Sequence, residues 1–140
     1  MDRAFLIVAC VFGFLGVAFG AFGSHALRAR LSPERIAQFE TGVRYQLWHA
    51  LALFAVVLVD SIRVAPMGGW TGFAPLLATR GFDLWSALAG WLFVAGIVLF
   101  SGSLYALALT GVRRWGAVTP FGGVCLLLGW LALLAAVVTR

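Results

Sequence analysis

Three stretches without a single charged residue constrain this chain more than any other feature. They cover residues 4–27, 84–112 and 115–139. A fourth apolar segment, Tyr45–Ile62, is shorter and contains Asp60. A helix needs about 20 apolar residues to cross roughly 30 Å of hydrocarbon, so each of the first three segments is long enough to span a bilayer. The sequence therefore predicts a small integral membrane protein.

The bilayer also decides the fold class. Lipid offers no hydrogen-bond partners to backbone groups, so only helices and closed barrels cross it. Barrel strands alternate apolar and polar residues, whereas Leu126–Val138 is apolar throughout. A chain of 140 residues, 63% of them apolar, has room for one four-helix unit. We therefore expect an all-α integral membrane protein, a single domain over 1–140 with four transmembrane helices in an antiparallel bundle.

The expected helices follow from the apolar segments and from the residues that break them. The four spans are predicted at about 5–24, 44–62, 86–109 and 115–138. Ser32-Pro33-Glu34 is typical of a helix start, with a capping Ser, Pro at the first position and an acid in the first turn. A short interfacial amphipathic helix is expected over about 33–42, running directly into the second span. Closely spaced Gly and Pro residues make 63–85 a loop.

The basic charge of the chain points to lipid headgroups and not to nucleic acid. The formal net charge is +5, and all ten basic residues are Arg, scattered through separate segments and not gathered in a stripe. Membrane proteins place basic residues at headgroups. Cys10 and Cys125 each stand alone in an apolar segment, so no disulfide or zinc site is predicted.

Small residues follow one face of the first predicted span. The helix-packing candidates recur at spacings of three, four and three: Gly13, Gly16, Gly20 and Gly23. Such a stripe lets two helix backbones approach closely. The partner helix is either in the same chain or in a second copy.

Polar residues gather on one side of the membrane. In an antiparallel bundle, the end of span 1, the start of span 2, the end of span 3 and the start of span 4 share that side. The candidates for ligand binding lie there: Ser24, His25, Glu40, Arg44, Tyr45, Gln46, His49, Ser101, Ser103, Tyr105 and Thr119. The opposite ends of the spans are mostly apolar, and Asp60 and Asp83 are expected to mark membrane interfaces. Glu40 and Arg44 have the spacing of a helical ion pair, with Arg44 extending to the headgroups or the pair lying inside the bundle.

His25 and His49 are the two histidines of the chain. Two imidazoles on adjacent helices could ligate haem iron or another metal. The plainer interpretation is hydrogen bonding to Tyr, Ser and carbonyl groups, because no third ligand type stands beside them. No carboxylate is placed to orient a catalytic base. We therefore expect no catalytic residue, no metal and no cofactor.

Several motifs resemble one family of proteins. They are Gly20–His25, Phe39–Ala50, Leu99–Tyr105, Thr119–Gly123 and Gly129-Trp130. In this order they resemble the small membrane proteins grouped as domain of unknown function 423, which are similar to animal transmembrane protein 256. The resemblance implies a four-helix, multi-pass protein of the bacterial plasma (inner) membrane and carries no activity with it. Residues 64–82 are longer than the usual connection in that family.

Three functional hypotheses follow, in order of preference. The first is a non-enzymatic membrane protein that self-associates, or is a subunit of a larger membrane complex, and binds a lipid headgroup or small ligand at the polar side. Five arginines flank that side: Arg28, Arg30, Arg44, Arg113 and Arg114. The second is a redox or cofactor-carrying subunit that uses the two histidines. The third is an oligomeric channel or transporter, although the apolar side offers it little polar lining.

Overall fold

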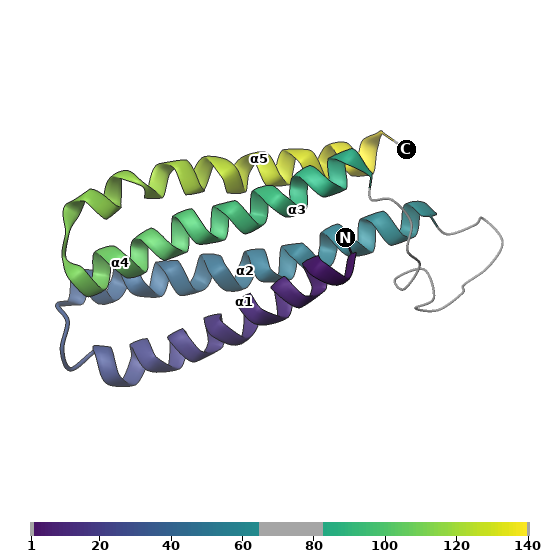
Figure 1. Ribbon diagram of the computed structural model, residues 1–140. Coiled ribbons are helices and arrows are strands. Elements are labelled where there is room, and N and C mark those ends of the chain that lie inside the picture. Colours follow the sequence, from purple (N-terminus) through teal and green to yellow (C-terminus); the bar gives the residue numbers. More distant parts are fainter. Residues whose placement is uncertain (1, 65–82, 140) are drawn as a thin grey trace.

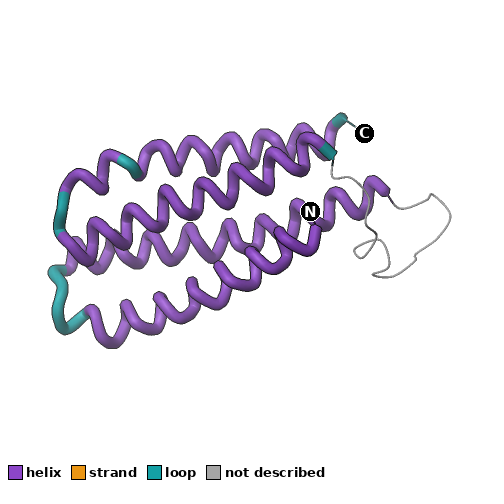
Figure 2. The backbone as a smooth tube through the Cα atoms, viewed as in Figure 1, coloured by secondary structure: helices purple, strands orange, loops and turns teal. Residues whose placement is uncertain are grey.

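The computed structural model describes residues 2–64 and 83–139, and these are helical apart from short turns (Figure 2). The elements are α1 (Asp2–Phe22), π-helical η1 (Gly23–Leu27), α2 (Pro33–Val64), α3 (Leu84–Gly96), π-helical η3 (Ile97–Ser101), α4 (Gly102–Thr110), 3-10 helix η4 (Arg113–Ala117) and α5 (Thr119–Val138). Since α3, η3 and α4 join end to end, four helices in the described ranges are long and apolar enough to cross a membrane. The predicted fold class is confirmed.

The helices lie side by side, with α2 in the interior of the arrangement (Figure 1). α1 packs along α2, and α5 packs along α3 and η3. α2 also contacts α3, η3 and α4, but has far fewer contacts with α5. The main core contains Phe5, Leu53, Val56 and Phe93. With this packing, α1 and α5 lie at opposite edges of the molecule (Figure 1).

The amphipathic segment 33–42 is continuous with the second span, as its sequence indicates. The hydroxyl of Ser32 accepts a weak hydrogen bond from the Arg35 amide at 3.5 Å, at the start of α2. Ile36 and Phe39 are buried against Leu27 and Ala108, so the apolar face of this segment packs on the protein. The predicted loop falls largely on 65–82, outside the described residues.

Glycines set the closest approaches between helices. A Cβ on Gly16 would lie 2.6 Å from Leu47, and one on Gly23 would lie 3.0 Å from Phe39, both in α2. Gly20 would meet Val43 at 3.4 Å, whereas Gly13 has nothing within 4 Å. The partner of the glycine stripe is therefore α2 of the same chain, and Gly13 takes no part in the contact.

Among the described glycines, Gly122 in α5 comes closest to the backbone of another helix, that of η3. A Cβ on Gly122 would overlap the backbone of Phe100 and lie 2.8 Å from the carbonyl carbon of Leu99. A backbone cannot move aside as a flexible side chain can. Gly122 is therefore the position at which helix packing tolerates a side chain least.

We predict that Gly122→Ala destabilises the protein by about 1–3 kcal/mol, because the added methyl forces α5 away from η3. Gly13→Ala is the matched control, since its methyl enters open space in α1 and Ala favours a helix over Gly by about 1 kcal/mol. The measurement is thermal unfolding in detergent, where Gly122→Ala should melt lower than both wild type and Gly13→Ala. Equal melting temperatures for the two variants would contradict the packing.

Candidate functional site

The predicted polar residues do not form one cluster. They form several separate hydrogen-bonded contacts, most of which join a different pair of helices. Ser24 and His25 lie apart from these contacts: both are exposed in η1, and the Ser24 hydroxyl donates to the Ala21 carbonyl of its own helix at 3.0 Å. This end of the molecule thus combines hydrogen bonds between helices with an exposed surface that contains Ser24 and His25.

Gln46 joins three helices. Its side chain is 3% exposed, and its Nε2 group donates to the carbonyl of Phe12 in α1 at 2.8 Å. The Oε1 atom accepts from the hydroxyl of Tyr105 in α4 at 2.9 Å. Both ends of a buried amide are therefore satisfied, as burial in an apolar interior requires. The arrangement fixes the register of α1 and α4 against α2.

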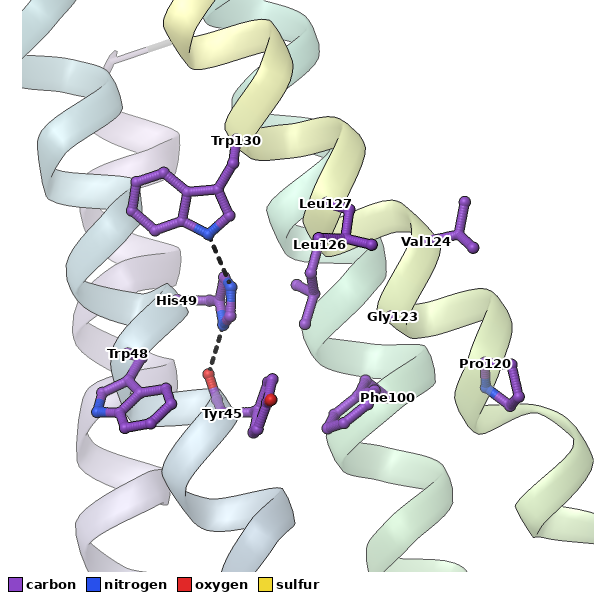
Figure 3. A pocket seen from close by; sticks show the side chains of 10 residues that line it. All are labelled: Tyr45, Trp48, His49, Phe100, Pro120, Gly123, Val124, Leu126, Leu127 and Trp130. Carbon is purple, nitrogen blue, oxygen red and sulfur yellow. Dashed lines mark hydrogen bonds between the residues drawn. The ribbon is translucent and has the colours of Figure 1, made fainter.

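His49 joins α2 to α5, and its contacts define where its proton lies (Figure 3). The Nδ1 atom lies 2.8 Å from the Tyr45 carbonyl. A carbonyl only accepts, so Nδ1 carries the hydrogen. The Nε2 atom then accepts from the indole Nε1–H of Trp130 at 3.2 Å. His49 is therefore a neutral imidazole with both ring nitrogens engaged.

This geometry does not favour the redox hypothesis. His25 is exposed in η1 while His49 is buried within α2, so the two imidazoles are not brought together. A metal would need a nitrogen lone pair of His49, and the Trp130 indole already occupies it. Across residues 2–64 and 83–139, no three His, Cys, Asp or Glu side chains are grouped as metal ligands would be.

Two further predicted residues pair across helices, and one has no partner. The hydroxyls of Ser103 and Thr119 lie 2.8 Å apart and link α4 to α5; Ser103 also bonds to the Phe100 carbonyl at 2.9 Å. The buried hydroxyl of Ser101, in η3, has no hydrogen-bond partner in the described structure. Neither Ser101 nor Ser103 contacts His49 through a hydrogen bond, so no nucleophile–base pair forms there.

The ion pair formed by Glu40 differs from the predicted one. Glu40 pairs with Arg28, with Nη2 and Oε1 3.3 Å apart, and not with Arg44. The expected helical ion pair of Glu40 and Arg44 is therefore wrong: Arg28 contacts Glu40 across the turn between η1 and α2. Arg44 is exposed, in agreement with its extension toward headgroups.

Arg35 has a structural role that the sequence analysis missed. Its Nε and Nη2 atoms donate to the carbonyls of Ala108 and Leu109 at 2.5 and 2.6 Å. These carbonyls belong to the last turn of α4, where helix carbonyls lack partners and a cation is favoured. Gly111 follows with φ 72°, a left-handed conformation typical of a glycine after a helix end. In the sequence, Gly111 marks the end of this helix, and a helix end is where a cation such as Arg35 is favoured.

The opposite end also contains a buried acid. Asp60 is 6% exposed and its Oδ1 atom accepts from the backbone amide of Asp83 at 3.1 Å. Asp83 in turn caps α3 by accepting from the amide of Trp85 at 3.2 Å. That both acids mark membrane interfaces stays a prediction. Asp60 is buried against the protein and ties the end of α2 to the start of α3.

A groove of about 480 Å³ lies between α2 and α5. His49 and Trp130 form part of its wall, and Phe100 of η3 faces them (Figure 3). Its lining is almost wholly apolar or aromatic: Tyr45, Trp48, His49, Phe100, Pro120, Gly123, Val124, Leu126, Leu127 and Trp130. Trp130, which stands in the sequence as part of the Gly129-Trp130 motif, lines this groove and also donates the hydrogen bond to His49.

The two tyrosines offer a matched test of the polar contacts. We predict that Tyr105→Phe lowers the free energy of unfolding by about 1–3 kcal/mol, because it leaves the buried Oε1 atom of Gln46 without its donor. Tyr45→Phe should change stability by less than about 0.5 kcal/mol, because no hydrogen bond of the Tyr45 hydroxyl is formed within the described part of the chain. Denaturation in mixed micelles measures both; equal losses would show that the Gln46 contact contributes nothing.

Comparison with known proteins places the chain among membrane proteins. The profile of a family described as "Protein of unknown function (DUF423)" matches residues 19–123. UPF0382 membrane protein YwdK of Bacillus subtilis is 36% identical over 136 residues, covering 97% of each chain. UPF0382 membrane protein SERP0230 of Staphylococcus epidermidis is 39% identical, covering 96% of this chain and 94% of the relative.

A third relative is similar to the same extent. UPF0382 inner membrane protein YgdD of Escherichia coli K12 is 35% identical over 137 residues, covering 98% of this chain and 91% of the relative. No solved structure matches the chain.

Proposed function

Since the chain belongs to the DUF423 family of membrane proteins, we propose that it is a non-enzymatic protein of the bacterial plasma membrane that binds anionic lipid headgroups at its arginine-rich end. The inner-membrane description of the Escherichia coli relative supports the location. The proposal concerns the end of the molecule formed by η1, the start of α2, the end of α4 and η4.

One observation carries this proposal: four arginines at that end face outward without a carboxylate partner in the described ranges. They are Arg30, Arg44, Arg113 and Arg114. The other two arginines there are engaged, Arg28 with Glu40 and Arg35 with the end of α4. A guanidinium binds a phosphate through two parallel hydrogen bonds, and each basic residue near an anionic membrane contributes about 1 kcal/mol of attraction.

The interior polar residues support a structural role. Gln46, His49 and Ser103 all have hydrogen-bond partners within the protein. A catalytic nucleophile needs a base within hydrogen-bonding reach, and the basic lone pair of His49 accepts from an indole. The polar interior is thus suited to holding the helices in register, while the exposed arginines are suited to a ligand.

We predict that the double variant Arg113→Gln, Arg114→Gln weakens binding of phosphatidylglycerol by about 30-fold, which corresponds to about 2 kcal/mol for two arginines. Native mass spectrometry of the detergent-solubilised protein, titrated with phosphatidylglycerol and with phosphatidylcholine, measures this. Arg3→Gln is the control, because Arg3 is exposed at the opposite end. Equal binding by both variants, or no preference for the anionic lipid in wild type, would contradict the proposal.

Self-association, or assembly into a larger membrane complex, is the second part of the proposal. The outer face of α1 is its candidate surface, since Ile7, Phe14 and Val17 are exposed there. The glycine stripe does not provide the interface, because Gly16, Gly20 and Gly23 already face α2. We expect native mass spectrometry in mild detergent to show a defined oligomer; a strictly monomeric protein that co-purifies with no other subunit would contradict this part.

A further inference from the structure

The groove between α2 and α5 is open at the side of the molecule. The indole rings of Trp48 and Trp130 stand at its edges, and their residues are 54% and 47% exposed. In a bilayer this face meets lipid, because α2 and α5 are both membrane-spanning. An apolar groove of about 480 Å³ at such a position is accessible to a lipid chain from the plane of the membrane.

The length of the groove corresponds to one leaflet. Its wall on α5 extends from Pro120, in the first turn, to Trp130, halfway along the helix. At 1.5 Å per residue this is about 15 Å, half of a hydrocarbon core of about 30 Å. Pro120 follows Arg114 by six residues. One end of the groove therefore lies near the arginine-rich end of the molecule and the other near the bilayer centre.

A hydrogen-bond donor is available near the arginine-rich end. The Tyr45 side chain turns into the groove, and its ring lies against Phe100, with ring centroids 4.5 Å apart (Figure 3). Its hydroxyl has no hydrogen-bond partner within residues 2–64 and 83–139. Arg44, exposed, directly precedes it. A phospholipid carries its ester carbonyls next to its phosphate, so the Tyr45 hydroxyl in this groove is suited to an ester oxygen.

From these features we infer that the groove holds one acyl chain of an anionic phospholipid. The chain extends from Pro120 toward Trp130, an ester oxygen accepts from the Tyr45 hydroxyl, and the phosphate meets Arg113 and Arg114. The order of chemical features along the site (cation, hydroxyl, apolar slot) matches the order of phosphate, ester and chain in the lipid. This inference rests on the proposed function for the headgroup and adds the bound chain.

Gly123 allows the groove to be closed without disturbing the core. A Cβ at Gly123 would lie 3.8 Å from the Phe100 ring, an ordinary contact, so a larger side chain projects into the groove. Gly102 is the matched control, since it is exposed on α4 with nothing within 4 Å. Val124→Trp fills the same groove from an exposed lining position and serves as a second variant.

The test is native mass spectrometry of the full chain in mild detergent, with phosphatidylglycerol, phosphatidylcholine and inorganic phosphate as separate probes and the melting temperature measured on each sample. We expect wild type and Gly102→Leu to retain one phosphatidylglycerol. Gly123→Leu and Val124→Trp should lose it while melting as wild type does. Tyr45→Phe should retain the lipid about five-fold more weakly, as the loss of one hydrogen bond implies.

Other outcomes separate this inference from the proposed function. Undiminished retention in both groove-filling variants would overturn the inference, and the proposed function would stand if the Arg113→Gln, Arg114→Gln variant still lost the lipid. Displacement of phosphatidylglycerol by inorganic phosphate at equal concentration would also overturn it, because a phosphate site without a chain would explain the binding. A change of oligomer mass in Gly123→Leu with unchanged lipid would assign the groove to a second copy instead.

Discussion

The hydrogen bonds made by α2 are the interactions on which the rest of the structure depends. In hydrocarbon, a buried polar group without a partner is costly, and α2 carries three of the six buried polar residues in the described ranges, Gln46, His49 and Asp60. Gln46 bonds to α1 and α4, His49 to α5, Arg35 to the end of α4, and Asp60 to the start of α3. Each neighbour of α2 is thus fixed at one depth by a directional contact, and the glycines then allow close packing at that depth.

The groove is a consequence of how α5 is held. Gly122 brings α5 against the backbone of η3, and Gly129 brings it against Phe93 of α3. Toward α2, by contrast, α5 has few contacts, of which the Trp130–His49 hydrogen bond is the polar one. α5 therefore packs closely on α3 and η3, and it is bonded to α2 at Trp130, halfway along its length. Between Trp130 and the start of α5, a space remains between α5 and α2. The end of that space at Pro120 lies a few residues from Arg113 and Arg114 of η4 in the sequence, so the apolar groove and the arginines occur together.

The fold was predictable from the sequence to a large extent, because lipid imposes helices and the charged residues mark their ends. The gathering of the predicted polar residues on one side of the membrane stays a prediction. The partners of these residues were not predictable: Glu40 pairs with Arg28 and not Arg44, since pairing across a turn depends on where two chain segments meet. The role of Trp130 was also hidden, because a tryptophan in an apolar helix has the same appearance in sequence whether or not its indole donates a hydrogen bond.

The hydrogen bond between Trp130 and His49 is the most important single contact, because it connects α5 to α2 and lies in the wall of the groove. It is tested most directly by ¹⁵N NMR of the histidine ring in lipid nanodiscs. The structure predicts a neutral His49 with hydrogen on Nδ1, an unprotonated Nε2, and a correlation from Nε2 to the indole proton of Trp130 that disappears in Trp130→Phe. A proton on Nε2, or an Nε2 signal unaffected by Trp130→Phe, would contradict the arrangement of α5 described above.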